Sequence, residues 1–341
     1  MELRKSVIFC LFCLLSLTGC SSIDDDLSDC GTEAELTYEL RLVTNISTEL
    51  QTELTTQTEL LLADALRSHL ENIFTDFAHD VDLSFYDTEG DSLRLQHDQH
   101  IMNANQASYT LNLPMREYMH LATANLAENK VVSLASDERC HSARLQQMER
   151  DTIDSHTTGL FTARQDMDVL EGIDQTFHVR LFMANCASTL VIDPRGHDYR
   201  DVKVYTTGFA TAFNICDTAY VYGKSPIVRA QRVADNGSGL LAYCSVSFPS
   251  KDPMRTVIET TEPFVAQEGE TALWEFRVYV TKNDGTVTET ILSLKQPLRA
   301  GELKILNARM MDDGSVSTTA SEVGVSVTLD WKPGGQHDIG L

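Results

Sequence analysis

Short runs in which apolar and polar residues alternate recur through the second half of the chain. Residues 274–281 alternate Trp, Phe, Val and Val with Glu, Arg, Tyr and Thr, and the turn 283–285 (Asn-Asp-Gly) follows. Residues 177–183 and 323–331 show the same period of two. This period puts one set of side chains on each face of a β-strand. Several such strands separated by turns predict a β-sandwich, and no helix is needed to explain residues 177–341.

The first half combines strands with one helix. Residues 34–43 and 81–86 alternate in the same way, so each is predicted to form a strand. Between them, apolar residues recur near helical spacing and predict an amphipathic helix over about 58–77 that packs against a sheet. These residues are Leu62, Leu66, Leu70, Ile73, Phe74 and Phe77.

The chain is long enough for two domains, each with its own core. We predict an all-β fold in which a removed segment, 1–19, is followed by an acidic tether, 20–33. An N-terminal β-sandwich domain with the helix then spans 34–168, and a C-terminal β-sandwich domain spans 175–341. Within the latter, residues 323–331 are predicted to form an integral core strand that completes its own sandwich rather than a strand donated to a neighbouring molecule, so a partner is expected to bind at another edge.

The N-terminus has the organisation of a secretory signal. Arg4 and Lys5 precede an apolar run over 7–17, which is too short to span a bilayer, and small residues then lead to Cys20. The sequence Leu17-Thr18-Gly19-Cys20 resembles the bacterial lipobox, in which the cysteine becomes the acylated first residue. We therefore expect cleavage before Cys20 and attachment to a membrane through lipid on that residue.

The charge of the chain argues against a nucleic-acid partner. The formal net charge is −23, from 27 Lys and Arg against 50 Asp and Glu. Such an excess repels phosphate backbones, and no basic stripe is present to offset it. The acidity is typical of a soluble protein surface.

Five cysteines remain besides Cys20 and those of the signal: Cys30, Cys140, Cys186, Cys216 and Cys244. An exported chain can keep disulfides, and an odd number leaves at least one free thiol. We predict pairs within each domain, Cys30 with Cys140 and Cys216 with Cys244, and a buried free thiol at Cys186. Their spacings do not match zinc sites.

No catalytic constellation is recognisable, and no metal or cofactor is expected. The nucleophile-elbow, zinc-protease and β-lactamase motifs are missing. His97 and His100 fall in a polar segment, predicted to be a loop, without a nearby third ligand. The triplet 223–225 (Gly-Lys-Ser) resembles the end of a P-loop, but Thr218 stands where the upstream glycine would be.

Several segments, in order, resemble the anchor-type fimbrillin lipoproteins of Bacteroidales, the base and accessory subunits of type V (Fim and Mfa) fimbriae. They are the lipobox with 25–30 (DDLSDC), 81–90 (VDLSFYDTEG), Leu113-Pro114 with Tyr118, 159–161 (GLF) and 323–341 (VGVSVTLDWKPGGQHDIGL). One departure is Met115-Arg116-Glu117, because relatives commonly carry glycine between Leu-Pro and Tyr.

The resemblance implies two transthyretin-like β-sandwiches, no enzymatic activity, and a role in holding a fimbrial stalk to the outer membrane. It also implies that the acidic run Asp24, Asp25 and Asp26 directs the lipoprotein to the outer face of that membrane. The expected partners are fimbrial stalk subunits, bound by addition of strands at sandwich edges. The alternative is a surface lipoprotein that binds glycans or nutrients, which exposed aromatics would favour; Trp274 and Trp331 instead fall in the inward register of their strands.

Overall fold

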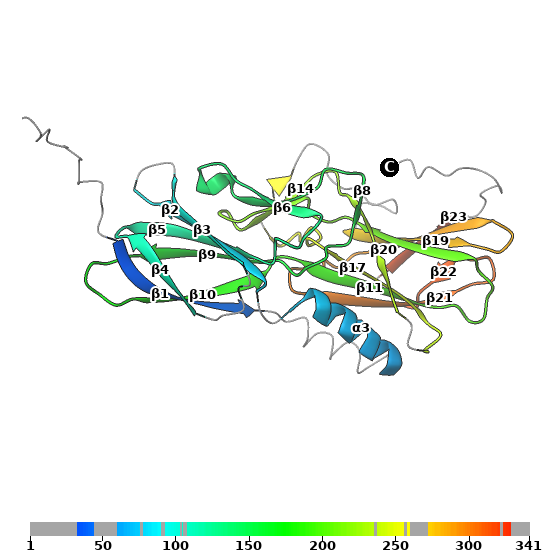
Figure 1. Cartoon of the computed structure of the whole chain (residues 1–341). Coiled ribbons are helices and arrows are strands. Elements are labelled where there is room, and N and C mark those ends of the chain that lie inside the picture. The colour runs from blue at the N-terminus through cyan, green and yellow to red at the C-terminus, as the bar shows by residue number, and fades with distance from the viewer. Residues whose placement is uncertain are drawn as a thin grey trace, which may run out of the picture.

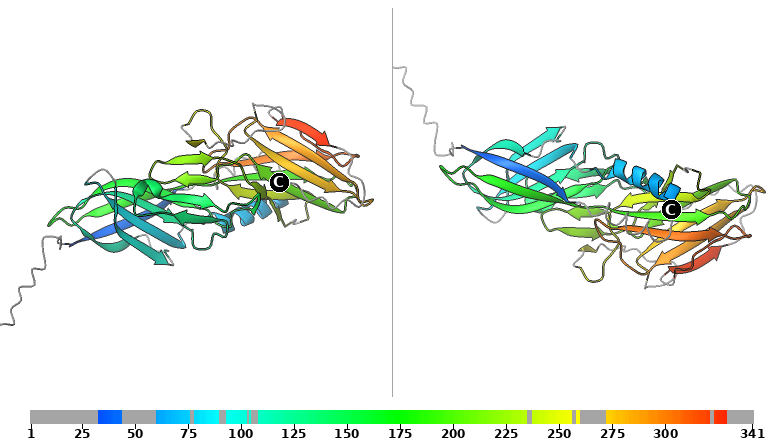
Figure 2. Two further views of the ribbon diagram at one scale, coloured as in Figure 1. Left: turned by 90° about the horizontal axis from the view of Figure 1, so that it is seen from above. Right: turned by 90° about the horizontal axis from the view of Figure 1, so that it is seen from below.

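In the residues that the structure describes, the protein is an elongated body of β-sheets with one α-helix (Figure 1). The computed structural model describes residues 33–43, 60–75, 78–89, 93–102, 104, 108–234, 237–255, 258–259, 272–320 and 323–328. Strand β1 starts at one end of the long axis, and the hairpin between β19 and β20 lies at the other end. Figure 2 shows the same elongation from above and from below.

Strands make up most of the described elements. In chain order, these are β1 (Glu33–Val43), α3 (Leu60–Ile73), β2 (Asp80–Asp87), β3 (Leu95–Met102), β4 (Ser108–Pro114), β5 (Glu117–Ala124), β6 (Val132–Ala135), the short 3-10 helix η2 (Cys140–Ser142), β7 (Arg144–Gln147), β8 (Thr152–Asp154), β9 (Phe161–Asp168), β10 (Thr176–Met183), β11 (Cys186–Asp193), β12 (Asp201–Thr207), β13 (Ala212–Asn214), β14 (Ala219–Tyr222), β15 (Ile227–Arg229), β16 (Gln231–Val233), β17 (Leu241–Ser247), β18 (Ile258–Glu259), β19 (Trp274–Thr281), β20 (Val287–Leu294), β21 (Leu303–Met310), β22 (Val316–Ser317) and β23 (Val323–Thr328). The predicted all-β class with a single helix is thereby confirmed.

The first sandwich is a single sheet of seven strands in the order β3-β2-β5-β9-β10-β1-β4. Only two residue pairs join β9 to β10, and there the sheet turns over into two layers (Figure 1). The alternating strands put their apolar faces between the layers. This core includes Leu36, Tyr38, Leu83, Phe85, Leu111, Leu113, Tyr118, Phe161, Val179 and Leu181.

The second sandwich consists of two sheets, β23-β20-β19-β12-β15-β8 and β16-β17-β11-β21-β22. The core between them includes Leu190, Ile192, Val202, Val204, Tyr243, Phe276, Val278, Leu292 and Leu306. Trp274 faces inward as predicted: it is 1% exposed, and its indole N–H donates to the main-chain oxygen of Gln296 at 3.0 Å. Trp331 lies outside the described residues.

A five-stranded sheet, β18-β14-β13-β7-β6, lies where the sandwiches meet, and we call it the junction sheet. It combines β6 and β7 from the first half of the chain with strands from the second half. Strand β10 pairs with β1 in the first sandwich, and β8 pairs with β15 in the second. The sheets therefore do not divide at 168–175 as predicted, because alternation indicates which face of a strand is buried but not which strand lies beside it.

Helix α3 carries the predicted apolar stripe but does not cover the first sandwich. Leu62, Leu66 and Leu70 are at most 1% exposed. They belong to the same apolar cluster as Val191, Val246 and Ile305 on the outer face of the five-stranded sheet of the second sandwich. Figure 1 shows α3 lying across that face. The helix thus links the two halves of the molecule.

Candidate functional site

Among the described strands, three that are six or more residues long lie at sheet edges: β3, β4 and β23. An edge strand offers unpaired N–H and C=O groups to another chain, and proteins usually protect such edges with charges. Strand β3 (LQHDQHIM) is polar, and Leu95 N–H donates to the oxygen of Glu138 at 2.8 Å, which covers its start. Strands β4 (SYTLNLP) and β23 (VGVSVT) carry no charged residue. The latter two are therefore the candidate pairing edges.

Strand β23 pairs antiparallel with β20, from Val323 opposite Leu294 to Thr328 opposite Glu289. Over these residues it belongs to its own sheet, as predicted, but it lies at the edge instead of the interior, so the expectation that a partner binds at another edge no longer follows. No other described strand pairs with its second side. Residues 329–341 lie outside the described residues.

A buried hydrogen-bonded pair lies inside the first sandwich. His120 Nδ1 donates to the carbonyl oxygen of Ser84 at 3.1 Å, so its Nε2 accepts a hydrogen bond from the Tyr38 hydroxyl at 2.5 Å. The imidazole also stacks on Phe85, with ring centroids 4.4 Å apart. Burial lowers the pKa of His120 to about 4 and raises the pKa of Tyr38. Both groups are neutral and satisfied, which is the pattern of a structural contact.

A second buried network joins the two sandwiches around His156. Asn185, between β10 and β11, donates its amide to His156 Nδ1 at 3.0 Å and accepts from Leu160 N–H at 2.6 Å. Because Nδ1 accepts, Nε2 carries the proton, and the Gln147 amide atom 2.7 Å away must be the oxygen. Burial lowers the pKa of His156 to about 3. The network fixes the path of the chain from one sandwich to the other.

Because His120 and His156 are buried in the neutral form, we expect the folded protein to lose stability in mild acid. Each has a folded-state pKa below its unfolded value of about 6.5. The unfolded chain therefore takes up protons that the folded chain excludes, and stability present above about pH 6.5 is lost as pH falls toward 4. Each histidine contributes a slope of up to about 1.4 kcal/mol per pH unit.

The prediction is checked by measuring the free energy of unfolding from pH 7.5 to 4 in the unaltered protein and in His156→Asn. The carboxylates titrate in both, so the difference between the two curves isolates His156. We expect a shallower fall in the variant. Parallel curves would contradict the assignment.

The cysteines pair differently from the prediction. Cys140 is bonded to Cys216, 76 positions away, with 5.8 Å between their Cα atoms. Both predicted pairs are therefore wrong: Cys244 is free and buried, and Cys30 lies outside the described residues. The predicted free, buried thiol at Cys186 is confirmed. Burial raises the pKa of the Cys186 thiol and raises that of Cys244 to about 11, which makes both poor nucleophiles.

The residues that suggested metal chemistry do not form a site. His97 and His100 lie on strand β3, not in a loop, and an odd spacing points them to opposite faces. His100 Nδ1 instead lies 2.6 Å from Asp82 Oδ1. Elsewhere His141 and Asp217 lie close to Cys216, but that sulfur is in the disulfide and is no thiolate ligand.

A surface groove of about 470 Å³ runs past the triplet 223–225. Ser225 Oγ accepts from the N–H groups of Gly208 at 2.8 Å and Phe209 at 2.9 Å, so the serine holds a turn. Lys224 pairs with Asp151 at 2.6 Å. None of the described residues that line the groove is aromatic. The stacking platform that would favour a glycan site is therefore missing there.

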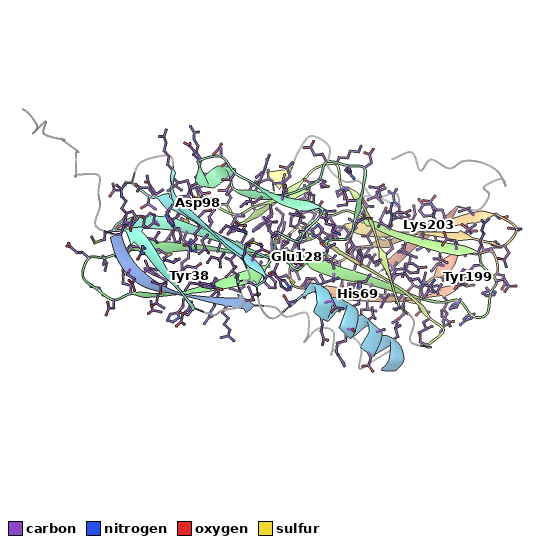
Figure 3. The ribbon with its side chains drawn as sticks, in the orientation of Figure 1. Tyr38, His69, Asp98, Glu128, Tyr199 and Lys203 are labelled. Carbon is purple, nitrogen blue, oxygen red and sulfur yellow. A yellow bond between two sulfur atoms is a disulfide. The ribbon has the colours of Figure 1, made fainter. Side chains whose placement is uncertain are left out.

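The predicted lipid site, Cys20, and the acidic run Asp24, Asp25 and Asp26 lie outside the described residues. Within the described part of the chain, no helix has the length and apolar character to cross a bilayer. The described residues nevertheless show that the start of β1 and the far end of the second sandwich lie at opposite ends of the long axis (Figure 1). Figure 3 places Tyr38 in the sandwich where β1 starts and Tyr199 toward the opposite end.

Comparison with known proteins gives structural neighbours only. No family model and no curated protein matches the chain. The fimbrial anchor protein Mfa2 from Porphyromonas gingivalis has 11% identity and a TM-score of 0.46, over 87% of this chain and 98% of that one. A candidate adhesin from Bacteroides ovatus has 13% identity and a TM-score of 0.49, over 81% and 87%. A candidate polysaccharide-binding protein from Bacteroides thetaiotaomicron has 9% identity and a TM-score of 0.48, over 88% of this chain and 99% of that one.

Proposed function

We propose that this protein is a non-enzymatic cell-surface lipoprotein that anchors or assembles fimbriae at the outer membrane through strand-mediated contacts with other subunits. The observation that carries the proposal is the uncharged edge strand β23 in the second sandwich, far from the start of β1 (Figure 1). A partner could bind there while the other end is held at the membrane.

On the membrane side, the proposal assigns attachment to lipid on Cys20 and outward transport to Asp24, Asp25 and Asp26. These residues precede Glu33, the first residue of β1, by 7 to 13 positions. Because β1 starts at the end of the long axis, a tether entering there would direct the second sandwich away from the bilayer. This arrangement suits a base subunit that faces the cell exterior.

On the partner side, an extended segment of a fimbrial stalk subunit would add to the side of β23 with which no described strand pairs. Main-chain hydrogen bonds would supply affinity, and pockets for alternate side chains would supply specificity. Among the long edge strands of the described residues, β4 is the other one without a charged residue, but its end, Pro114, pairs with Glu33 at the start of β1. An occupant of β4 would therefore lie at the membrane end, which favours β23 for the stalk.

The test uses two adjacent proline variants, Val325→Pro and Ser326→Pro. In an antiparallel strand, the N–H groups of successive residues point to opposite sides, so one of these positions bonds β20 and the other faces outward. Proline removes the N–H group. The variant that loses a home hydrogen bond should be destabilised by about 1–3 kcal/mol. The outward variant should melt nearly like the unaltered protein.

The functional measurement is the ratio of cell-bound fimbriae to fimbriae released into the medium. We expect the outward variant to lower this ratio at least tenfold while its melting temperature is retained. The same pair of substitutions on edge strand β3, Asp98→Pro and Gln99→Pro, is the matched control. Normal retention of fimbriae by the stable β23 variant would overturn the proposed contact.

A further inference from the structure

The loop between β9 and β10, residues 169–175, displays two apolar side chains at the end of the molecule where β1 starts. Leu170 is 42% exposed and Ile173 is 55% exposed. Figure 1 shows this loop at the extreme of the long axis, and both views in Figure 2 agree. Large apolar side chains at the tip of a loop are exposed to water, which is unfavourable. They are stabilised by the hydrophobic effect only when another surface covers them.

The loop is held in a defined shape. The Gln175 side chain bridges its two ends: its oxygen accepts from Leu170 N–H at 2.8 Å, and its nitrogen donates to the oxygen of Asp168 at 2.9 Å. At the root, Val169 is buried, and its N–H donates to Arg116 O at 3.0 Å. Hydrogen bonds therefore fix the loop conformation in which Leu170 and Ile173 are exposed.

The register of the sheet connects this loop to the start of the described chain. Strands β1 and β10 are parallel, Thr37 lies opposite Thr176, and Thr37 N–H donates to Gln175 O at 3.0 Å. From Thr37 back to Glu33, the chain therefore extends toward the same end of the molecule as the loop. From Glu33, 13 peptide units lead back to Cys20, a reach of at most about 45 Å. Lipid on Cys20 would thus keep the loop close to a bilayer.

We propose that Leu170 and Ile173 rest in the lipid interface and form a second contact with the membrane, which limits the tilt of the elongated body. The inference rests on the proposed lipid attachment. Two apolar side chains would not hold the protein on a membrane alone, but the lipid on Cys20 makes their contact intramolecular and raises their effective concentration.

The charges around the loop indicate which lipid surface it suits. Exposed acidic side chains accompany the apolar pair: Asp168, Glu171 and Asp174 lie in or next to the loop, and Glu117 lies opposite Asp168 in the sheet. The nearby cation Arg116 is paired with Asp87 at 2.7 Å. Acidic lipid headgroups would be repelled, so the contact should be stronger on uncharged or zwitterionic lipid.

The experiment places a tryptophan reporter at each end of the full, lipidated protein. Ile173→Trp reports on the loop. Met311→Trp, in the turn after β21 at the opposite end, is the matched control because Met311 is 45% exposed. Each variant is bound to phosphatidylcholine vesicles with brominated acyl chains, and quenching is corrected for the unaltered protein. We expect at least twofold stronger quenching at position 173 than at position 311.

Two further measurements make the outcome decisive. Adding Leu170→Asp to the Ile173→Trp protein should abolish the extra quenching, and adding phosphatidylglycerol to the vesicles should weaken it. Vesicle-bound protein with equal quenching at both ends, or quenching that survives Leu170→Asp, would overturn the loop contact while leaving the lipid anchor intact. Failure of every variant to float with vesicles would instead refute the lipid attachment, and the inference would fall with it.

Discussion

Replacement of Cys20 by alanine is expected to remove the protein from the membrane fraction altogether. The described part of the chain has no helix able to cross a bilayer, and residues 7–17 belong to the segment predicted to be removed. Several acyl chains on one cysteine give a firm anchor, whereas two loop side chains do not. Detergent partitioning and metabolic acyl labelling measure the result.

A cysteine elsewhere provides the control for that experiment. Cys186→Ala alters a buried thiol in the second sandwich and should leave both partitioning and labelling unchanged. A Cys20→Ala protein that still partitions with membranes and still carries label would show that the lipobox interpretation is wrong. Loss of label with retained partitioning would point to a different means of membrane attachment.

Elements with strong periodicity could be predicted from the sequence. Strands β1 and β19 alternate clearly because each buries one face, and α3 repeats leucine near every fourth residue for the same reason. What covers a buried face could not be predicted. The stripe on α3 is compatible with any apolar sheet, and only the folded chain places it on the second sandwich.

The errors share one physical cause, which is dependence on contacts distant in the sequence. Strand β3 was expected to be a loop because its polar residues lack apolar alternation, and it becomes a strand by pairing with β2. The bond between Cys140 and Cys216 depends on segments that meet when β7 pairs with β13. Neither pairing leaves a local pattern. The candidate edge at β23 was likewise hidden, because alternation does not distinguish an edge strand from a central one.

Gly208 is another residue whose tolerance of substitution depends on a contact with residues distant in the sequence. It follows β12 with a φ of +103°, a conformation that favours glycine. A Cβ atom there would lie 2.6 Å from both the Leu273 oxygen and the Trp274 Cα. Since both are main-chain atoms, the clash cannot be relieved by a side-chain rotation. It would push β12 away from the strand that carries the buried Trp274.

Gly208→Ala is therefore expected to lower the free energy of unfolding by about 3 kcal/mol or more, because positive-φ strain and a backbone clash add together. Gly285→Ala is the matched control: its φ is +86°, but a Cβ there would meet nothing within 4 Å. Only the strain, about 1 kcal/mol, should appear in that variant. Denaturant-induced unfolding of the two variants measures the difference in their free energies of unfolding. Equal stability of the two variants would mean that Trp274 and Gly208 do not approach each other as closely as described.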